Sequence, residues 1–321
     1  MTPELLTPEA ENLDRAASAL RAGTLVAFPT ETVYGLGADA TNDDAVAAIF
    51  ATKKRPTFNP LIVHVNDVSE AETYAEIDDV GHLLAEHFWP GGLTLVVPRS
   101  VDCGLSLLVS AGLDTVALRV PAHDVAQRLL DAVARPLAAP SANPSGRLSP
   151  TEAAHVMEGL GGEDALSYVI DGGPCSLGLE STVVGLPTIG PPTLLRPGAI
   201  PRSDIEAVLG HALADPEAPG GEEGRSSPGM LASHYAPNAS LRLNATDCGE
   251  DEMLLGFGDV DCALNLSASG DVSEAAANLF SMLRKLDAEA DGKSLAVSPI
   301  PMEGLGEAIN DRLARAAAPR N

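Results

Sequence analysis

The chain has 321 residues, of which 45% are hydrophobic, so it is long enough to form about two domains with sizeable cores. Its formal charge is −25 at pH 7. This charge argues against a sequence-independent nucleic-acid binder, because such a protein needs a basic face for the phosphates.

Cysteine spacing and hydropathy exclude further classes of protein. The cysteines are Cys103, Cys175, Cys248 and Cys262, and no two of them have the C-x-x-C spacing of a zinc site or a redox pair. No apolar run is long enough to span a bilayer, and the N-terminus lacks the basic and apolar regions of a signal peptide. We therefore expect a cytoplasmic protein with free thiols.

The stretch from Thr24 to His64 carries the first group of motifs. The apolar run from Thr24 to Phe28 is typical of a buried strand, and Pro29 ends it because proline has no backbone donor. A turn rich in hydroxyls follows, and then Tyr34 between apolar neighbours and two glycines. A second strand is predicted over residues 60–64.

Between these strands, Asn42 is predicted to cap a helix over residues 43–53. The helix ends in Lys53-Lys54-Arg55, the only run of three basic residues in an acidic chain. Cations at a helix C-terminus also complement the helix dipole, and that explanation would suffice for an isolated run. The hydroxyls, tyrosine and glycines before this helix favour a second interpretation, a bound anion.

Arg119 lies inside the apolar run of a strand predicted over residues 115–120. A charge in that position is costly unless it is paired. A structural ion pair and a ligand contact are both open at this point.

Polar side chains then recur at predicted turns. Ser141 and Asn143 follow residues 136–140, which are predicted to form a strand, and open α/β sheets usually bind ligands at strand ends. Turn chemistry alone would also account for these residues. Ser149 with Glu152, and Ser203 with Glu206, match the capping box and predict two helix starts.

Downstream, Glu180 to Val184 presents hydroxyls at the head of a strand, and Arg196 stands beside a further turn. The composition then changes. Residues 1–210 are predicted to form one domain, 211–238 a linker, and 239–321 a smaller domain in which strands and helices alternate. Its predicted strands are 241–243, 253–257 and 294–300, and its predicted helices are 271–288 and 304–317.

Several of these segments together resemble a known family. FPTETVYGLGADA, K-x-R, NPLIVHV, SAN, ESTVV, LRPG and SPGM…SHYAP occur in the order found in the two-domain form of the threonylcarbamoyl-AMP synthases, which has an N-terminal YrdC-type domain. The resemblance covers nearly the whole chain. It implies a mixed α/β fold, with a twisted open sheet of YrdC type and a second, smaller Rossmann-like parallel α/β domain.

The resemblance also implies an activity, that of an L-threonylcarbamoyladenylate synthase. This nucleotidyltransferase makes threonylcarbamoyl-AMP and pyrophosphate from L-threonine, bicarbonate and ATP, with Mg²⁺ as cofactor. A downstream transferase then modifies tRNA beside the anticodon. We expect no metal ligand from protein side chains, no membrane partner and no direct binding of tRNA.

Site residues follow from the matched motifs. Lys53 and Arg55 are expected to be catalytic. The linker is expected to fold across the site through Tyr235, with His234 beside it. The resemblance assigns threonine and bicarbonate to Thr32, Tyr34, His64, Arg119 and Ser181, and the nucleotide to Lys53, Ser141, Asn143, Arg196 and Tyr235.

Two alternative functions share parts of this pattern. The first is an RNA-binding or ribosome-assembly factor, which the charge of −25 counts against. The second is the carbamoyl-adenylate chemistry of hydrogenase-maturation proteins with a related domain. Those proteins also carry zinc-finger cysteines and an acylphosphatase region, and this sequence has neither.

Overall fold

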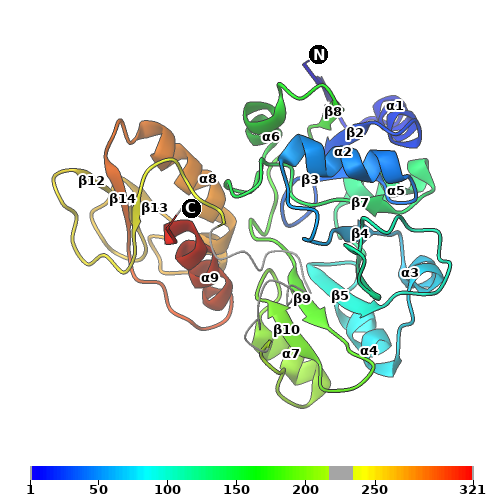
Figure 1. Ribbon diagram of the computed structural model, residues 1–321. Coiled ribbons are helices and arrows are strands. Elements are labelled where there is room, and N and C mark those ends of the chain that lie inside the picture. The colour runs from blue at the N-terminus through cyan, green and yellow to red at the C-terminus, as the bar shows by residue number, and fades with distance from the viewer. Residues whose placement is uncertain (1, 217–233, 320–321) are drawn as a thin grey trace.

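The computed structural model describes residues 2–216 and 234–319. The described residues form two sheets, each with its own helices (Figure 1). We call the elements from β1 to α7 the large unit and those from β11 to α9 the small unit. Two parts of the predicted linker, Pro219 to Gly224 and Leu231 to Ser233, lie outside the described residues.

The large unit is built on a mixed sheet of ten strands. Some neighbouring strands are parallel and others antiparallel, so the strands run through the sheet in both directions. In spatial order the strands are β1 (Glu4–Leu6), β8 (Leu166–Ile170), β2 (Leu25–Phe28), β3 (Gly35–Asp39), β7 (Leu137–Ala138), β4 (Ile62–His64), β6 (Thr115–Arg119), β5 (Leu93–Pro98), β9 (Thr182–Gly185) and β10 (Thr193–Arg196).

Helices cover both faces of this sheet. Successive side chains of β2 belong to different clusters: Val26 and Phe28 to one, and Leu25 and Ala27 to the other. The first cluster contains α1 (Ala10–Arg21) and α5 (Asp124–Val133). The second contains α2 (Asp43–Lys53), α3 (Val68–Tyr74), α4 (Asp79–Phe88), α6 (Ala153–Leu160) and α7 (Arg202–Leu209).

Helix α2 has the predicted limits. The Asn42 side chain accepts hydrogen bonds from the backbone N–H groups of Asp44 and Ala45, and this cap begins the helix. Lys54 ends it in the left-handed conformation, with φ of 52°. The helix therefore places Lys53 at its last turn, where the side chain turns into the protein.

Both predicted capping boxes are wrong. Helix α6 begins at Ala153, because the Ser149 hydroxyl donates to Glu180 instead of capping a helix. Helix α7 begins at Arg202. In that helix Glu206 accepts from the backbone N–H of Leu213, so it does not reach back to Ser203.

The small unit has four strands, all parallel to their neighbours. The predicted fold class, a mixed YrdC-type sheet with a Rossmann-like parallel α/β unit, is confirmed. Asp271 caps the helix α8 by accepting from the N–H of Glu274. In spatial order the strands are β11 (Leu241–Arg242), β14 (Ser294–Val297), β12 (Glu252–Gly256) and β13 (Leu264–Asn265), with helices α8 (Val272–Glu289) and α9 (Gly306–Ala317).

The two units share a hydrophobic core at their junction. Val33, Leu148 and Leu179 of the large unit lie in one buried cluster with Tyr235 and with α8 and α9. The small unit is therefore packed against the large one by apolar contact as well as by charge. The predicted domain limits at residues 210 and 238 stay a prediction.

Among the helices of the described ranges, none is both long enough and apolar enough to cross a bilayer.

Candidate functional site

Lys53 and the loop after β7 form the first part of the site. The Lys53 side chain is 2% exposed, and its Nζ donates to the carbonyl oxygens of Ser141, at 2.6 Å, and Asn143. The Lys53 carbonyl in turn accepts from the N–H of Ser145. The ammonium group thus holds the loop that carries two predicted nucleotide contacts. Its burial, together with nearby Arg55, lowers the pKa of Lys53 well below its ordinary value.

Arg55 is held by the backbone that leads into β4. Its Nε donates to the Asn59 carbonyl at 3.2 Å, and one Nη donates to the Pro60 carbonyl at 2.9 Å. Neither partner is charged. Burial and the neighbouring Arg196 lower the pKa of Arg55 to about 10, so the two guanidinium groups repel one another across the site.

Arg196 and Ser181 join β10 to the turn before β9. The Arg196 side chain donates twice to the Ser181 carbonyl, at 3.1 and 2.7 Å, and once to the Ser181 hydroxyl at 3.1 Å. That hydroxyl also lies 2.7 Å from the Thr94 hydroxyl on β5. Arg196, a predicted nucleotide contact, and Ser181, a predicted substrate contact, are therefore hydrogen-bonded to one another.

Arg119 makes a buried ion pair. One Nη donates to Glu31 Oε1 at 2.6 Å, the other donates to the Thr32 hydroxyl at 2.9 Å, and Nε donates to the Gly91 carbonyl. The ion-pair interpretation of Arg119 therefore holds in this structure. Glu31 Oε2 has no hydrogen-bond partner among the described residues, so the pair retains an open acceptor. Arg119 and Thr32, two of the five predicted contacts to threonine and bicarbonate, therefore lie together.

Tyr34 and His64 are two further predicted contacts to threonine and bicarbonate. The Tyr34 hydroxyl donates to the Gly173 carbonyl at 2.8 Å, and burial raises the pKa of the phenol. Burial lowers the pKa of His64 to about 3, so its imidazole is neutral near pH 7. Within the described ranges His64 Nδ1 has no hydrogen-bond partner, although the ring packs edge-on against Phe28.

Tyr235 is buried at the junction of the two units. Its ring centre lies 5.5 Å from that of Phe280 and 5.3 Å from the guanidinium carbon of Arg312. The phenol also lies near enough to Arg55 and Arg196 to affect the pKa of both. Tyr235 therefore links the core of the small unit to the cationic groups of the large one.

His234 precedes Tyr235, and the two ring centres are 4.1 Å apart. Burial lowers the pKa of His234 to about 3, which leaves it neutral near pH 7.

Several residues of the site were not predicted from the sequence. Glu31 and Glu180 stand within the motifs FPTETVYGLGADA and ESTVV, and that position was the signal that could have found them. Thr94 and Arg312 carried no local signal, because their partners are distant in the sequence.

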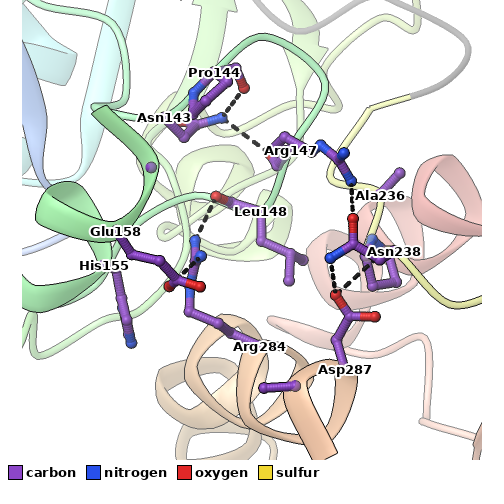
Figure 2. A pocket seen from close by; sticks show the side chains of 13 residues that line it. Asn143, Pro144, Arg147, Leu148, His155, Glu158, Ala236, Asn238, Arg284 and Asp287 are labelled. Carbon is purple, nitrogen blue, oxygen red and sulfur yellow. Dashed lines mark hydrogen bonds and ion pairs between the residues drawn. The ribbon is translucent and has the colours of Figure 1, made fainter. Parts of the chain in front are cut away.

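A cavity of about 250 Å³ lies at the junction, with Asn143 in its wall (Figure 2). Arg284 of α8 extends from below to the Leu148 carbonyl, at 3.0 Å, and to Glu158. On the other side, Asn238 accepts from Arg147 and donates to Asp287. Polar contacts between the two units therefore frame the space beside the predicted nucleotide loop.

Carboxylates and histidines of the described residues do not gather in groups of three that could hold a metal ion. At the site itself, Glu180 has both oxygens occupied, one by Ser149 and one by Arg312. The polar groups of this site are buried cations, hydroxyls and backbone carbonyls, together with the carboxylates of Glu31 and Glu180.

Comparison with known proteins identifies this arrangement. A family model described as telomere recombination matches residues 18–198, and a model of the threonylcarbamoyl-AMP synthase C-terminal domain matches residues 200–318. A threonylcarbamoyl-AMP synthase of Pyrococcus abyssi is 41% identical over 95% of this chain and 94% of its own length. The chain belongs to the threonylcarbamoyl-AMP synthase family. The family predicted from the sequence motifs is confirmed.

Other relatives of the threonylcarbamoyl-AMP synthase family agree over the full length. The synthase of Bacillus subtilis is 39% identical over 100% of this chain and 96% of its own. The crystal structure of Sua5 from Pyrococcus abyssi in complex with L-threonine has a TM-score of 0.88 at 38% identity, covering 99% of this chain and 98% of that one. YciO of Escherichia coli, at 23% identity and a TM-score of 0.55, shares the fold of the large unit.

Proposed function

We propose that this protein is an L-threonylcarbamoyladenylate synthase and acts as a nucleotidyltransferase. The observation that carries the proposal is the grouping of the cations Lys53, Arg55 and Arg196: besides burial, Arg55 lowers the pKa of Lys53 and Arg196 lowers the pKa of Arg55. Such mutual repulsion is relieved when an anion binds between the cations. ATP and a carbamate are anions of the required kind.

In the first step, the amine of L-threonine attacks the carbon of bicarbonate and water leaves, which gives an N-carboxylate. A carboxylate oxygen of this intermediate then attacks the α-phosphorus of ATP. The bond from that phosphorus to the pyrophosphate oxygen breaks, and pyrophosphate leaves with the electron pair. Neither step needs a protein nucleophile, so the protein contributes positioning and charge neutralisation.

The side chains divide this work. Arg119 and Thr32 support binding of threonine, and the neutral His64 offers a hydrogen bond from its unpartnered ring nitrogen. Lys53 and Arg55 neutralise the carbamate and the phosphates. Arg196 neutralises the charge that develops on the phosphates.

When bound with ATP, Mg²⁺ would supply charge neutralisation for the phosphates. Glu180 has both oxygens in hydrogen bonds, and the open oxygen of Glu31 belongs to a carboxylate that is already paired with Arg119. We propose accordingly that protein carboxylates do not hold the ion. The product would pass to a tRNA threonylcarbamoyl transferase.

Pyrophosphate release from ATP tests the function directly. We expect release only when L-threonine, bicarbonate and Mg²⁺ are all present. L-serine and L-valine, which lack one part of the threonine side chain each, serve as matched controls for the amino acid. Release that does not depend on threonine would contradict the proposal, because it would show that the site adenylates another acceptor.

A further inference from the structure

Arg312 brings the small unit into contact with the site. It lies on α9, and its side chain is 1% exposed. Its Nε donates to Glu180 Oε2 at 2.9 Å, and one Nη donates to the Pro197 carbonyl at 2.8 Å. The same Nη also donates to Asp311 at 2.8 Å. One guanidinium thus joins two separate loops of the large unit.

These two loops carry the Ser181–Arg196 pair described above. Glu180 directly precedes Ser181, and Pro197 directly follows Arg196. The loops also touch one another, because a Cβ added to Gly198 would lie 2.5 Å from the carbonyl oxygens of Glu180 and Ser181. Arg312 therefore contacts the residue next to each member of the pair: Glu180 beside Ser181 and Pro197 beside Arg196.

We propose that Arg312 is a positioning residue for the synthase reaction, through which the small unit sets the placement of Ser181 and Arg196. The proposal rests on the proposed function, since it assigns Arg196 to the phosphates of ATP. Arg312 acts through Glu180 and Pro197 and does not touch the substrates itself. The small unit is then part of the working site.

A simple ion pair between the units would not need this geometry. One Arg312 N–H group is enough to pair with the Glu180 oxygen that Ser149 leaves open. Arg312 nevertheless donates a second hydrogen bond, to the Pro197 carbonyl beside Arg196. A buried ion pair also adds little stability over apolar packing, because desolvation offsets the attraction. The same helix already carries a separate ion pair to the large unit, between Glu307 and Arg202 at 3.0 Å.

That second ion pair supplies the matched control. Arg312→Lys keeps the charge, but a single ammonium group cannot bridge Glu180 and Pro197 with the planar fork of a guanidinium. Glu307→Gln removes the ion pair between α9 and Arg202 of α7 and leaves the contacts of Arg312 in place. Steady-state rates of pyrophosphate release, ATP titration by calorimetry and thermal unfolding are measured for both variants.

For Arg312→Lys we expect kcat/KM for ATP to fall about tenfold, as loss of one charge-assisted hydrogen bond allows. Affinity for ATP in the titration should fall by a similar factor. Glu307→Gln should leave both values within about twofold of wild type. If the two variants lose activity equally, or if Arg312→Lys keeps wild-type kinetics, the proposal is wrong.

A double variant distinguishes two roles of Arg312, the placement of the Pro197 backbone and the neutralisation of Glu180. Arg312→Gln with Glu180→Gln removes both buried charges, so the thermal stability should recover relative to Arg312→Gln alone. We expect kcat/KM to stay low in the double variant, because the tie to Pro197 is lost. Recovery of wild-type kinetics would overturn the proposal by showing that Arg312 only neutralises Glu180. This comparison also decides the matter if Arg312→Lys does not fold.

The two proposals fail in different ways. A wild-type protein that releases no pyrophosphate contradicts the synthase function. The ATP titration still compares Arg312→Lys with wild type in that case, and equal affinities would contradict the role of Arg312 alone.

Discussion

The ammonium group of Lys53 lies 2.6 Å from the carbonyl oxygen of Ser141, although the two residues are 88 positions apart in the chain. The last turn of α2 is thereby fastened to the loop after β7. Because a lysine in this position is almost fully buried, its charge is balanced by carbonyl dipoles and by whatever anion enters the site. The loop geometry and the anion site therefore depend on the same group.

Replacing Lys53 by Met should lower kcat/KM for ATP by about 100-fold or more, since it removes a cation that we propose neutralises the phosphates. Lys54→Asn is the matched control, because Lys54 is exposed and asparagine tolerates its left-handed backbone. Pyrophosphate release measures both variants. Equal activity of Lys53→Met and Lys54→Asn would refute a catalytic role for Lys53.

ATP binding should be accompanied by uptake of a proton. The pKa of Lys53 is well below 10.5 in the protein without ligand, and a nearby polyphosphate favours the charged form and raises it. Above the lowered pKa, the ligand therefore brings a proton with it. Calorimetry in two buffers of different ionisation enthalpy measures this uptake. Lys53→Met should abolish it, and uptake that persists in the variant would point to another group.

The lowered pKa of Lys53 should also make the stability of the fold depend on pH. Between the lowered pKa of Lys53 and 10.5, the unfolded chain binds more protons at this position than the folded protein. This contribution makes the free energy of unfolding rise with pH across that window. Urea unfolding of wild type and Lys53→Met at several alkaline pH values should show the difference in slope.

His64 should make the protein sensitive to acid. Its pKa is lowered from 6.5 to about 3, so the unfolded state takes up a proton at a higher pH than the folded state does. The free energy of unfolding should therefore fall as the pH falls from 6.5 towards 3, by at most about 1.4 kcal/mol per pH unit for this group.

Urea unfolding of His64→Asn measures that contribution, because asparagine does not titrate. Its pH slope should be smaller than that of wild type over the same range. His82→Asn is the control, since His82 lies at the surface beside Glu72. A slope that His64→Asn leaves unchanged would show that His64 is not held neutral.

The buried pair of Arg119 and Glu31 should be costly to break. Glu31→Gln leaves the guanidinium without its counter-charge, and we expect a loss of about 3 kcal/mol in the free energy of unfolding. Asp124→Asn, which breaks the exposed pair with Arg128, should change little. Chemical unfolding at pH 7 compares them. A loss no larger than that of Asp124→Asn would mean that water reaches Arg119.

Local sequence determined the parts of this protein that depend on near neighbours. The limits of α2 follow from Asn42 at its start and from the basic run at its end, all within the helix and its caps. The motifs around Thr32, Ser141 and Arg196 likewise indicated the family and the small-anion chemistry. The limits of α2 are readable because hydrogen bonds between residues a few positions apart set them, whereas the family was recognised from the order of the motifs along the chain.

Tertiary structure alone decided which polar groups meet. Ser149 had the sequence of a helix cap, but its hydroxyl donates to Glu180, 31 positions away. Arg312 stood in a helix with no motif, yet it lies against Glu180 across 132 positions. A buried donor takes the partner that the packed core presents, whatever its local pattern favours. The placement of Ser181 and Arg196 against the small unit was therefore settled by packing.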